Sequence, residues 1–295
     1  MFPIEQYHRA TSIGHACRLL ADYPGSKLIA GGTDVLIRLR EGKPGFSALI
    51  DIHGLNELTN IKKASDGTLH IGSGVSFSQL ISYLRKGRLL PALADGASSI
   101  GGPQVRNMAT LGGNICNGAP SADSAAPLLV FDAQVTLQSL RGIRHVSVEA
   151  FYAGPGKVHL EPDEMVTGFS ISPESQQDTG SYFYKYAMRK AMDIATIGCA
   201  AACRLKDNRI QSLRLAYTVA APVPKRCHVL EEQVTGQPVS GELIADIASR
   251  VLEELSPRNS WRASRDFREH IIRTLAHRVV TEAIVRAGGQ LENRV

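Results

Sequence analysis

The spacing of apolar residues predicts a small strand–helix–strand unit at the start of the chain. Between residues 13 and 20 the apolar side chains recur every three or four positions, which favours a helix, and Ser12 is suited to cap its first turn. Apolar runs at 27–30 and 48–52 indicate strands. Between these two runs, residues 34–39 are typical of a short helix or turn.

The middle of the chain mixes alternating and helical patterns. Two short runs flank Asp66-Gly67, a dipeptide typical of a tight hairpin turn. Helices are expected at 77–84 after the cap Ser76, at 90–97 and at 124–131, and strands at 61–63, 68–72, 134–138, 145–148 and 165–171. The polar stretch Ser172–Gly180 then marks a boundary between two domains.

The last third of the chain favours an antiparallel sheet covered by helices. Its three expected strands are 181–186, 194–205 and 210–219, and Asp207-Asn208 is expected to turn the second hairpin. Apolar residues at helical spacing follow at 243–252 and again after the cap Ser264. These patterns predict an α+β chain with domains at 1–175 and 180–290, the first of them divided near Asn56.

Composition limits the classes of protein that the chain can represent. Its 295 residues are 43% hydrophobic and 21% charged, which is typical of globular domains, and the formal net charge is only +5. We expect neither nucleic acid nor a membrane as partner, because no block of Lys and Arg alternates with aromatics and apolar runs such as 124–131 are too short to span a bilayer. Glu5, His8 and Arg9 do not match a signal peptide, so a cytoplasmic location is expected.

The cysteines and histidines do not suggest a metal or catalytic centre. Five cysteines are spread widely, and this odd number without framework spacing argues against a disulfide scaffold. Only Cys199 and Cys203 are close, inside an apolar run where small buried residues are the simpler interpretation. The histidines show neither metal-ligand spacing nor a triad pattern. We therefore predict no metal ligand and no catalytic residue on this chain.

Two glycine-containing segments are the candidates for a ligand-binding site. Gly31-Gly32-Thr33 follows an apolar strand, and Thr110-Leu111-Gly112-Gly113-Asn114 repeats the combination of paired glycines and a threonine. A single Gly-Gly pair is ordinarily just a turn. Two such loops, with backbone N–H groups turned toward one point, fit a ligand with two linked phosphates better.

Other phosphate-binding motifs do not match. Gly72-Ser73-Gly74 and Gly154-Pro155-Gly156 begin a dinucleotide motif, but Phe77 and His159 stand where its third glycine belongs. Neither glycine segment has the lysine of a P-loop. Stand-alone Rossmann enzymes and ATPases are therefore disfavoured.

The order of these segments resembles a known family. Residues 27–34, then 106–114 and 119–123, and further on 185–189 and 192–195, are similar in order and spacing to the FAD-binding subunits of molybdenum hydroxylases. The resemblance covers nearly the whole chain. It implies a two-part FAD-binding domain of the vanillyl-alcohol oxidase type, followed by a C-terminal domain of three antiparallel strands with helices.

The resemblance also implies which residues hold the cofactor. The two glycine segments would clamp the FAD pyrophosphate, and Asp123 would hold the ribityl or ribose part. Ile100 would pack on the face of the isoalloxazine, and Met165 and Val166 would contact its edge. Lys185 matches the lysine that contacts the isoalloxazine. The full set is Lys27, Leu28, Ile29, Ala30, Gly31, Gly32, Thr33, Asp34, Ile100, Ala109, Thr110, Leu111, Gly112, Gly113, Asn114, Asp123, Met165, Val166 and Lys185.

Simpler interpretations of several of these residues stay open. Ile100 and Val166 could be ordinary core residues, and Lys185 a solvent-exposed strand lysine. Asp34 could cap the following helix. Arg189 and Asp193 could pair or shape the cofactor mouth.

The function that the resemblance implies is electron transfer. We expect a subunit that holds FAD non-covalently in a xanthine dehydrogenase-like complex, takes electrons from [2Fe–2S] clusters and reduces NAD. The molybdenum cofactor and the clusters would lie on a molybdenum-binding and an iron–sulfur partner chain. The alternatives are another molybdenum hydroxylase (an aldehyde, nicotinate, aromatic-CoA or carbon monoxide dehydrogenase) and an assembly module that has lost the flavin.

Overall fold

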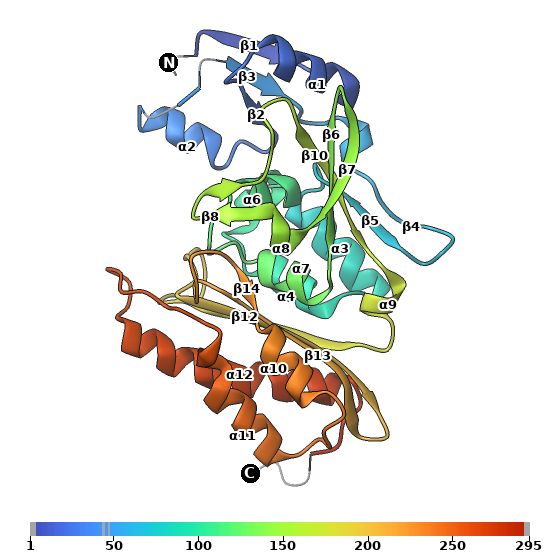
Figure 1. The fold of residues 1–295 in the computed structure, drawn as a ribbon. Coiled ribbons are helices and arrows are strands. Elements are labelled where there is room, and N and C mark those ends of the chain that lie inside the picture. The colour runs from blue at the N-terminus through green and yellow to red at the C-terminus, as the bar shows by residue number, and fades with distance from the viewer. Residues whose placement is uncertain (1–3, 43–44, 47, 292–295) are drawn as a thin grey trace.

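The computed structural model describes residues 4–42, 45–46 and 48–291. Figure 1 shows one sheet at the N-terminal end of the molecule, a second sheet in the middle, and a third sheet with its helices at the C-terminal end. The described residues form a three-stranded, a five-stranded and a four-stranded sheet, and a separate two-stranded ribbon. This mixed fold confirms the α+β prediction.

The first unit is a parallel sheet with two helices. β2 (Lys27–Ile29) and β1 (Gln6–Arg9) pair on either side of β3 (Ala48–Asp51). α1 (Ile13–Asp22) begins at Ser12, whose side chain accepts a hydrogen bond from the His15 N–H, as expected for a cap. α2 (Val35–Arg40) follows β2. β1 was not predicted, because Gln-Tyr-His-Arg has no apolar run.

The five-stranded sheet is antiparallel and forms the centre of the molecule. Its order is β4 (Ile61–Lys63), β5 (Leu69–Gly72), β10 (Met165–Ile171), β6 (Gln134–Ser139) and β7 (Gly142–Ser147). Gly67 turns the β4–β5 hairpin with a φ of +90°, which explains the glycine there. β8 (Tyr152–Gly154) and β9 (Lys157–Val158) form the separate ribbon, with Gly156 between them. The predicted strands of this region are confirmed.

Helices join and cover these strands. They are η1 (Asn56–Leu58), α3 (Phe77–Gly87), α4 (Pro91–Ser98), α5 (Pro103–Met108), α6 (Leu111–Cys116), α7 (Ala125–Val130), α8 (Val148–Phe151) and α9 (Pro173–Gln176). Ser76 and Gln79 form a capping box at the start of α3. The expectation that the second glycine segment is a loop was wrong: Thr110 caps α6, and Gly112 and Gly113 lie in its first turn.

The C-terminal sheet has four strands rather than the three predicted. Its order is β11 (Gly180–Tyr186), β12 (Ile197–Lys206), β13 (Arg209–Thr218) and β14 (Lys225–Arg226). β14 was missed because it is only two residues long and polar. The helices that follow are α10 (His228–Val234), α11 (Gly241–Arg250), η2 (Val251–Glu253) and α12 (Arg265–Arg286). The helices expected at 243–252 and after Ser264 are therefore present, and α10 is an addition.

The C-terminal sheet is buried on both faces. Ala200 and Ala202 of β12 belong to the central core, whereas Cys199, Ala201 and Cys203 pack toward the C-terminal helices. This two-sided burial explains why β12 is a continuous apolar run without alternation. All five cysteines are free thiols, in agreement with the absence of a disulfide framework from the sequence.

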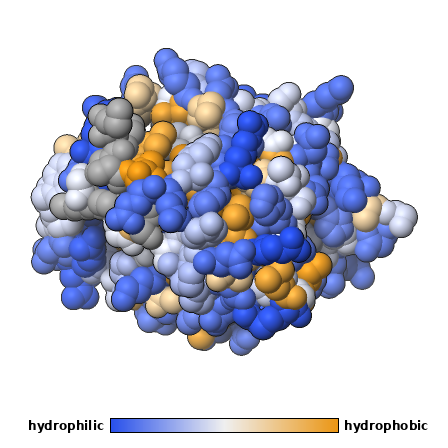
Figure 2. All heavy atoms as spheres, turned by 90° about the horizontal axis from the view of Figure 1, so that it is seen from above, coloured by the Kyte–Doolittle hydropathy of each residue, from blue (hydrophilic) through white to orange (hydrophobic). Residues whose placement is uncertain are grey.

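The end of the molecule that carries the three-stranded sheet is largely polar. Figure 2 shows small, separate groups of apolar side chains among charged and polar ones on this face. Exposed apolar residues of the first unit include Tyr7, Leu36 and Ile37. In the residues described, no helix combines the length and the hydropathy needed to cross a bilayer.

Candidate functional site

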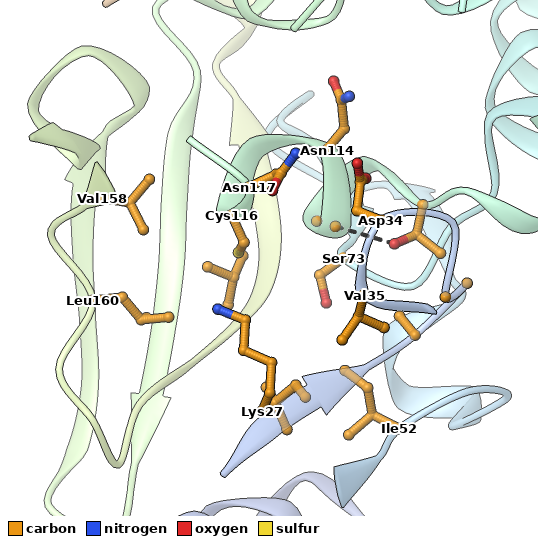
Figure 3. Close-up of a pocket in the computed structure, with 18 of the residues that line it drawn as sticks. Lys27, Asp34, Val35, Ile52, Ser73, Asn114, Cys116, Asn117, Val158 and Leu160 are labelled. Atoms are coloured by element: carbon orange, nitrogen blue, oxygen red, sulfur yellow. Dashed lines mark hydrogen bonds between the residues drawn. The ribbon is translucent and has the colours of Figure 1, made fainter. Parts of the chain in front are cut away.

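A cavity of about 580 Å³ lies among the first unit, α6 and the β8–β9 ribbon. In Figure 3, Asp34, Val35 and Ile52 lie on one side of it and Val158 and Leu160 on the other, with Cys116 and Asn117 of the α6 region and Ser73 between them. Three segments that are far apart in the sequence therefore meet around one space.

The first glycine segment contributes unpaired backbone donors to this cavity. Residues 30–35 line it, and the N–H groups of Gly31–Val35 have no hydrogen-bond acceptor among the described residues. A Cβ on Gly31 would lie 1.8 Å from the carbonyl oxygen of Met108, so only glycine permits this approach of the two segments. Gly32 has a φ of +73°, which also favours glycine. This segment retains the donors that a phosphate requires.

The second glycine segment uses its backbone donors within the protein. The Gly113 N–H donates to Oγ1 of Thr110 at 3.1 Å, and the Gly112 N–H donates to the Ser73 carbonyl at 2.9 Å. The Asn114 N–H donates to the Thr110 carbonyl at 3.0 Å. The expected symmetry, in which both segments offer open N–H groups, is therefore not found. The α6 side instead offers space at Gly113 and the side-chain amide of Asn114, whose Oδ1 accepts from Ser124 at 2.7 Å.

Two hydroxyl groups that line the cavity have no partner. The Oγ atoms of Ser26 and Ser73 are buried, and neither has a hydrogen-bond partner among the described residues. A buried hydroxyl without a partner is costly, so each of them is suited to a polar ligand atom.

Charges of both signs border the cavity. Lys27, Arg38 and Lys157 line it together with Asp34, Glu161 and Glu164. Hydrogen bonds from Arg144 lower the pKa of Glu164, and the two groups lie 2.6 Å apart. Burial raises the pKa of Asp34, and Arg38 opposes this shift. Asp34 makes no side-chain hydrogen bond that caps α2, so the capping interpretation is not supported.

The rest of the lining is apolar. Leu28, Ile52, Val158, Leu160 and Val166 face the cavity from three different elements. Cys116 belongs with them, because burial raises the pKa of its thiol to about 12 and keeps it protonated at neutral pH. Figure 3 shows the Lys27 side chain extending toward Cys116. An apolar wall beside unpaired backbone N–H groups suits a ligand that carries a flat ring as well as phosphates.

Most of the residues predicted from the sequence line this cavity. The members that line it are Lys27, Leu28, Ala30, Gly31, Gly32, Thr33, Asp34, Ala109, Thr110, Gly112, Gly113, Asn114 and Val166. The members that do not line it are Ile29, Ile100, Leu111, Asp123, Met165 and Lys185. Met165, for example, is fully buried in the core beneath the first unit.

Asp123 and Lys185 form a buried ion pair outside the cavity lining. Lys185 Nζ lies 2.6 Å from Oδ2 of Asp123 and donates to the Ser99 carbonyl at 3.1 Å. Their side chains are only 10% and 7% exposed, so Lys185 is not a solvent-exposed strand lysine. Burial raises the pKa of Asp123 to about 6, although Lys185 opposes the shift, and its Oδ1 has no partner among the described residues. The pair joins the central part of the chain to β11.

Arg189 and Asp193 form an ion pair, which is one of the two roles that the sequence left open for them. Arg189 and Asp193 lie 3.8 Å apart, and Asp193 also lies 3.5 Å from Arg262. Arg189 and Asp193 lie on the segment between β11 and β12, and Arg262 lies on the loop that precedes α12.

Sequence reasoning missed one wall of the cavity and several polar groups. The missed wall is the segment 153–164, of which only the Gly154-Pro155-Gly156 turn was noted. Ser73 lay inside a glycine motif that was rejected as a dinucleotide fingerprint, so its side chain was not considered. Arg38 donates to Oδ1 of Asn117 at 3.0 Å, a contact 79 positions apart that no local pattern indicates.

The backbone N–H groups of the first glycine segment, set beside an apolar wall, are suited to a cofactor that carries phosphates. Residues 2–173 match the family model described as "FAD binding domain in molybdopterin dehydrogenase". Residues 182–283 match the "CO dehydrogenase flavoprotein C-terminal domain". The chain belongs to the family of FAD-binding flavoprotein subunits of the molybdenum hydroxylases.

Individual relatives agree over nearly the full chain. The chain is 50% identical over 292 residues to the xanthine dehydrogenase FAD-binding subunit of Escherichia coli O157:H7, covering 99% of this chain and 100% of that relative. It is 30% identical to the glyceraldehyde dehydrogenase medium chain of Sulfolobus acidocaldarius, covering 96% and 99%. A solved structure of carbon monoxide dehydrogenase from Hydrogenophaga pseudoflava contains a chain with a TM-score of 0.91 at 29% identity, covering 97% and 99%.

Proposed function

We propose that this chain is the FAD-carrying electron-transfer subunit of a xanthine dehydrogenase-like molybdenum hydroxylase, and that it passes electrons from iron–sulfur clusters to NAD. The observation that carries the proposal is the 50% identity to a xanthine dehydrogenase FAD-binding subunit across 99% of the chain. When bound, FAD accepts electrons singly and delivers them as a hydride.

The residues that line the cavity fit one part of this cofactor. We assign the pyrophosphate to the N–H groups of Gly31–Val35, with the space above Gly113 left free of side chain. The apolar wall would cover a ring and exclude water from the phosphate contacts. Non-covalent binding by backbone donors requires no reactive side chain at the cofactor.

A second group of residues is assigned to the flavin end. Ile100 is 8% exposed and borders Ser99, whose carbonyl accepts from Lys185. Lys185 and Asp123 would orient this end, since a cation there stabilises charge that arrives with electrons. We assign Val166 and Met165 to the same end, with Met165 acting through the packing of β10 rather than by direct contact.

We propose that the chain is divided into two domains, the FAD-binding domain at residues 1–175 and a C-terminal domain at residues 180–290.

The relatives are named as subunits or as medium chains, and this supports a hetero-oligomer. We propose that the molybdenum cofactor and the [2Fe–2S] clusters are held by partner chains. Among the described residues, no three His, Cys, Asp or Glu side chains gather as a metal site.

The same architecture in another molybdenum hydroxylase is the second candidate. The glyceraldehyde dehydrogenase medium chain matches 96% of this chain at 30% identity, so related chains serve dehydrogenases of different substrates. The 50% relative favours a purine over an aldehyde.

The test has two steps. The chain is first purified alone and its FAD content and absorbance near 450 nm are measured, with about one FAD per chain expected. The chain is then co-expressed with a candidate molybdenum-binding chain and a candidate iron–sulfur chain, and any complex that forms is assayed with hypoxanthine or aldehydes, with NAD as acceptor. A colourless, FAD-free chain would support the assembly-module alternative. Turnover of aldehydes but not of hypoxanthine would show that the chain serves an aldehyde-oxidising molybdenum hydroxylase instead.

A further inference from the structure

Ser73 has one group that the protein leaves without a partner. Its N–H donates to the Thr167 carbonyl at 3.0 Å, and its carbonyl accepts from the Gly112 N–H at 2.9 Å. The residue is only 4% exposed, and its Oγ has no hydrogen-bond partner among the described residues. The backbone of Ser73 is therefore fixed on both sides while its hydroxyl stays unpaired.

The close packing of Gly112 determines where this hydroxyl lies. A Cβ on Gly112 would be 2.6 Å from the Cβ of Ser73, so α6 rests directly against this residue. Ser73 lines the cavity, and Figure 3 shows its hydroxyl directed into the space between α6 and Val35. A buried, unpaired hydroxyl that is aimed into a cavity is expected to bind a polar atom of a ligand.

The hydrogen bonds of α6 indicate which ligand atom this is. The N–H groups of Gly112, Gly113 and Asn114 all have acceptors within the protein, whereas those of Gly31–Val35 across the cavity find none in the part of the chain that the structure describes. A diphosphate bound to the open donors would therefore find few backbone donors on the α6 side. The hydroxyl of Ser73 supplies a donor there.

We propose that the Ser73 hydroxyl donates a hydrogen bond to a phosphate oxygen of the cofactor diphosphate. This inference rests on the proposed function, because it takes the ligand of the cavity to be FAD. It adds a side-chain ligand to a site whose other assigned contacts are backbone donors.

The test compares Ser73→Ala with a control, Thr218→Val. Thr218 is fully buried and its hydroxyl is also unpaired among the described residues, but it does not line the cavity. Each deflavinated full-length chain is titrated with FAD and with ADP, and the thermal midpoint of the ligand-free chain is recorded.

For Ser73→Ala we expect affinities about 10-fold or more weaker for both ligands, because a hydrogen bond to a charged phosphate is lost. The ligand-free chain should be at least as stable as the wild type, because an unpaired buried hydroxyl is removed. Thr218→Val should bind both ligands as the wild type does.

Each alternative outcome has a separate meaning. If the wild-type chain binds no FAD, the proposed function fails before Ser73 is tested. If the wild type binds FAD and Ser73→Ala binds it equally well, the Ser73 inference alone is overturned. Weaker FAD binding with unchanged ADP binding would overturn the assignment to phosphate. If Ser73→Ala lowers the midpoint of the ligand-free chain, Ser73→Cys keeps a side chain of similar size with a weaker donor. Wild-type affinity in Ser73→Cys would then overturn the inference.

Discussion

At the scale of single residues, glycines in the two segments have different reasons to be glycine. Gly31 allows the carbonyl of Met108 to approach, and Gly112 allows α6 to rest on Ser73. Gly113 has only Oγ1 of Thr110 near the place of a Cβ, at 3.1 Å, and otherwise borders the cavity. Substitution of Gly112 therefore perturbs packing, whereas substitution of Gly113 perturbs the ligand space.

The first prediction contrasts these two glycines. Gly113→Asp should fold but be purified without colour, because it places bulk and negative charge beside the phosphates. Gly112→Ala should lose about 2 kcal/mol or more of stability through its clash with Ser73. Thermal unfolding and the FAD content of both variants check this. Stoichiometric FAD in Gly113→Asp would contradict the assignment of the second segment.

The second prediction concerns the pH dependence of the Asp123–Lys185 pair. The folded-state pKa of Asp123, about 6, lies above its unfolded value, so the stability linked to its protonation is present at low pH and is lost as the pH rises toward 6. Lys185→Met removes the cation that opposes this shift, and the folded-state pKa should rise further. The stability penalty of the variant should therefore be about 1–3 kcal/mol larger at pH 8 than at pH 5.

Denaturant unfolding at the two pH values measures this difference. Lys185→Arg keeps the positive charge and is the matched control, for which no such growth with pH is expected. An equal penalty for Lys185→Met at both pH values would mean that Asp123 does not titrate against Lys185.

At the scale of secondary-structure elements, sequence patterns were reliable where one periodicity dominated. The helix after Ser12, the β4–β5 hairpin at Gly67 and the helix after Ser264 follow local signals and were all predicted. α6 was missed, because paired glycines favour a loop, and the Thr110 cap together with packing on Ser73 overrides that preference.

The candidate site was only partly predictable for a different reason. The glycine segments could be found because paired glycines beside a threonine are a recognisable local sequence. The wall at 153–164, the Arg38 contact and the Ser73 hydroxyl are brought to the cavity by tertiary packing. The pairing of Asp123 with Lys185 also depends on tertiary structure, since the two residues are 62 positions apart.

The third prediction tests the contact between α2 and the end of α6. Arg38 of α2 reaches Asn117 at 3.0 Å, and both residues line the cavity. Arg38→Ala should speed FAD dissociation by about 3- to 10-fold, because one hydrogen bond that holds α2 near the cofactor is lost. Asn117→Ala should have the same effect, and the double variant should add little more.

Stopped-flow measurement of FAD release gives these rates. Arg40→Ala, on the same helix, is the control and should release FAD at the wild-type rate, since Arg40 does not line the cavity. Fully additive effects of Arg38→Ala and Asn117→Ala would show that the two residues do not act through each other.

At the scale of the whole molecule, the C-terminal sheet is coupled to the central part by packing and by charge. Residues of β12 contribute to both cores, and Asp132 pairs with Arg214 of β13 at 2.8 Å and with Arg226 of β14. The two arginine side chains are only 15% and 14% exposed. Loss of the shared carboxylate would leave two largely buried guanidinium groups with weaker partners.

The fourth prediction follows from this network. Asp132 has a φ of +49°, which asparagine tolerates, so Asp132→Asn removes the charge without backbone strain. We expect a loss of about 2 kcal/mol in the free energy of unfolding. Asp163→Asn, which breaks the pair with the exposed Arg141, should cost less than about 1 kcal/mol. Urea unfolding of both variants decides this, and equal costs would argue against a special role for Asp132.

The measurement that tests the central claim most directly is a crystal structure of the chain with FAD bound. We expect the pyrophosphate within hydrogen-bond distance of the N–H groups of Gly31–Val35, and passing over Gly113. A diphosphate bound elsewhere, with these N–H groups still unpaired, would contradict the account of how this chain holds its flavin.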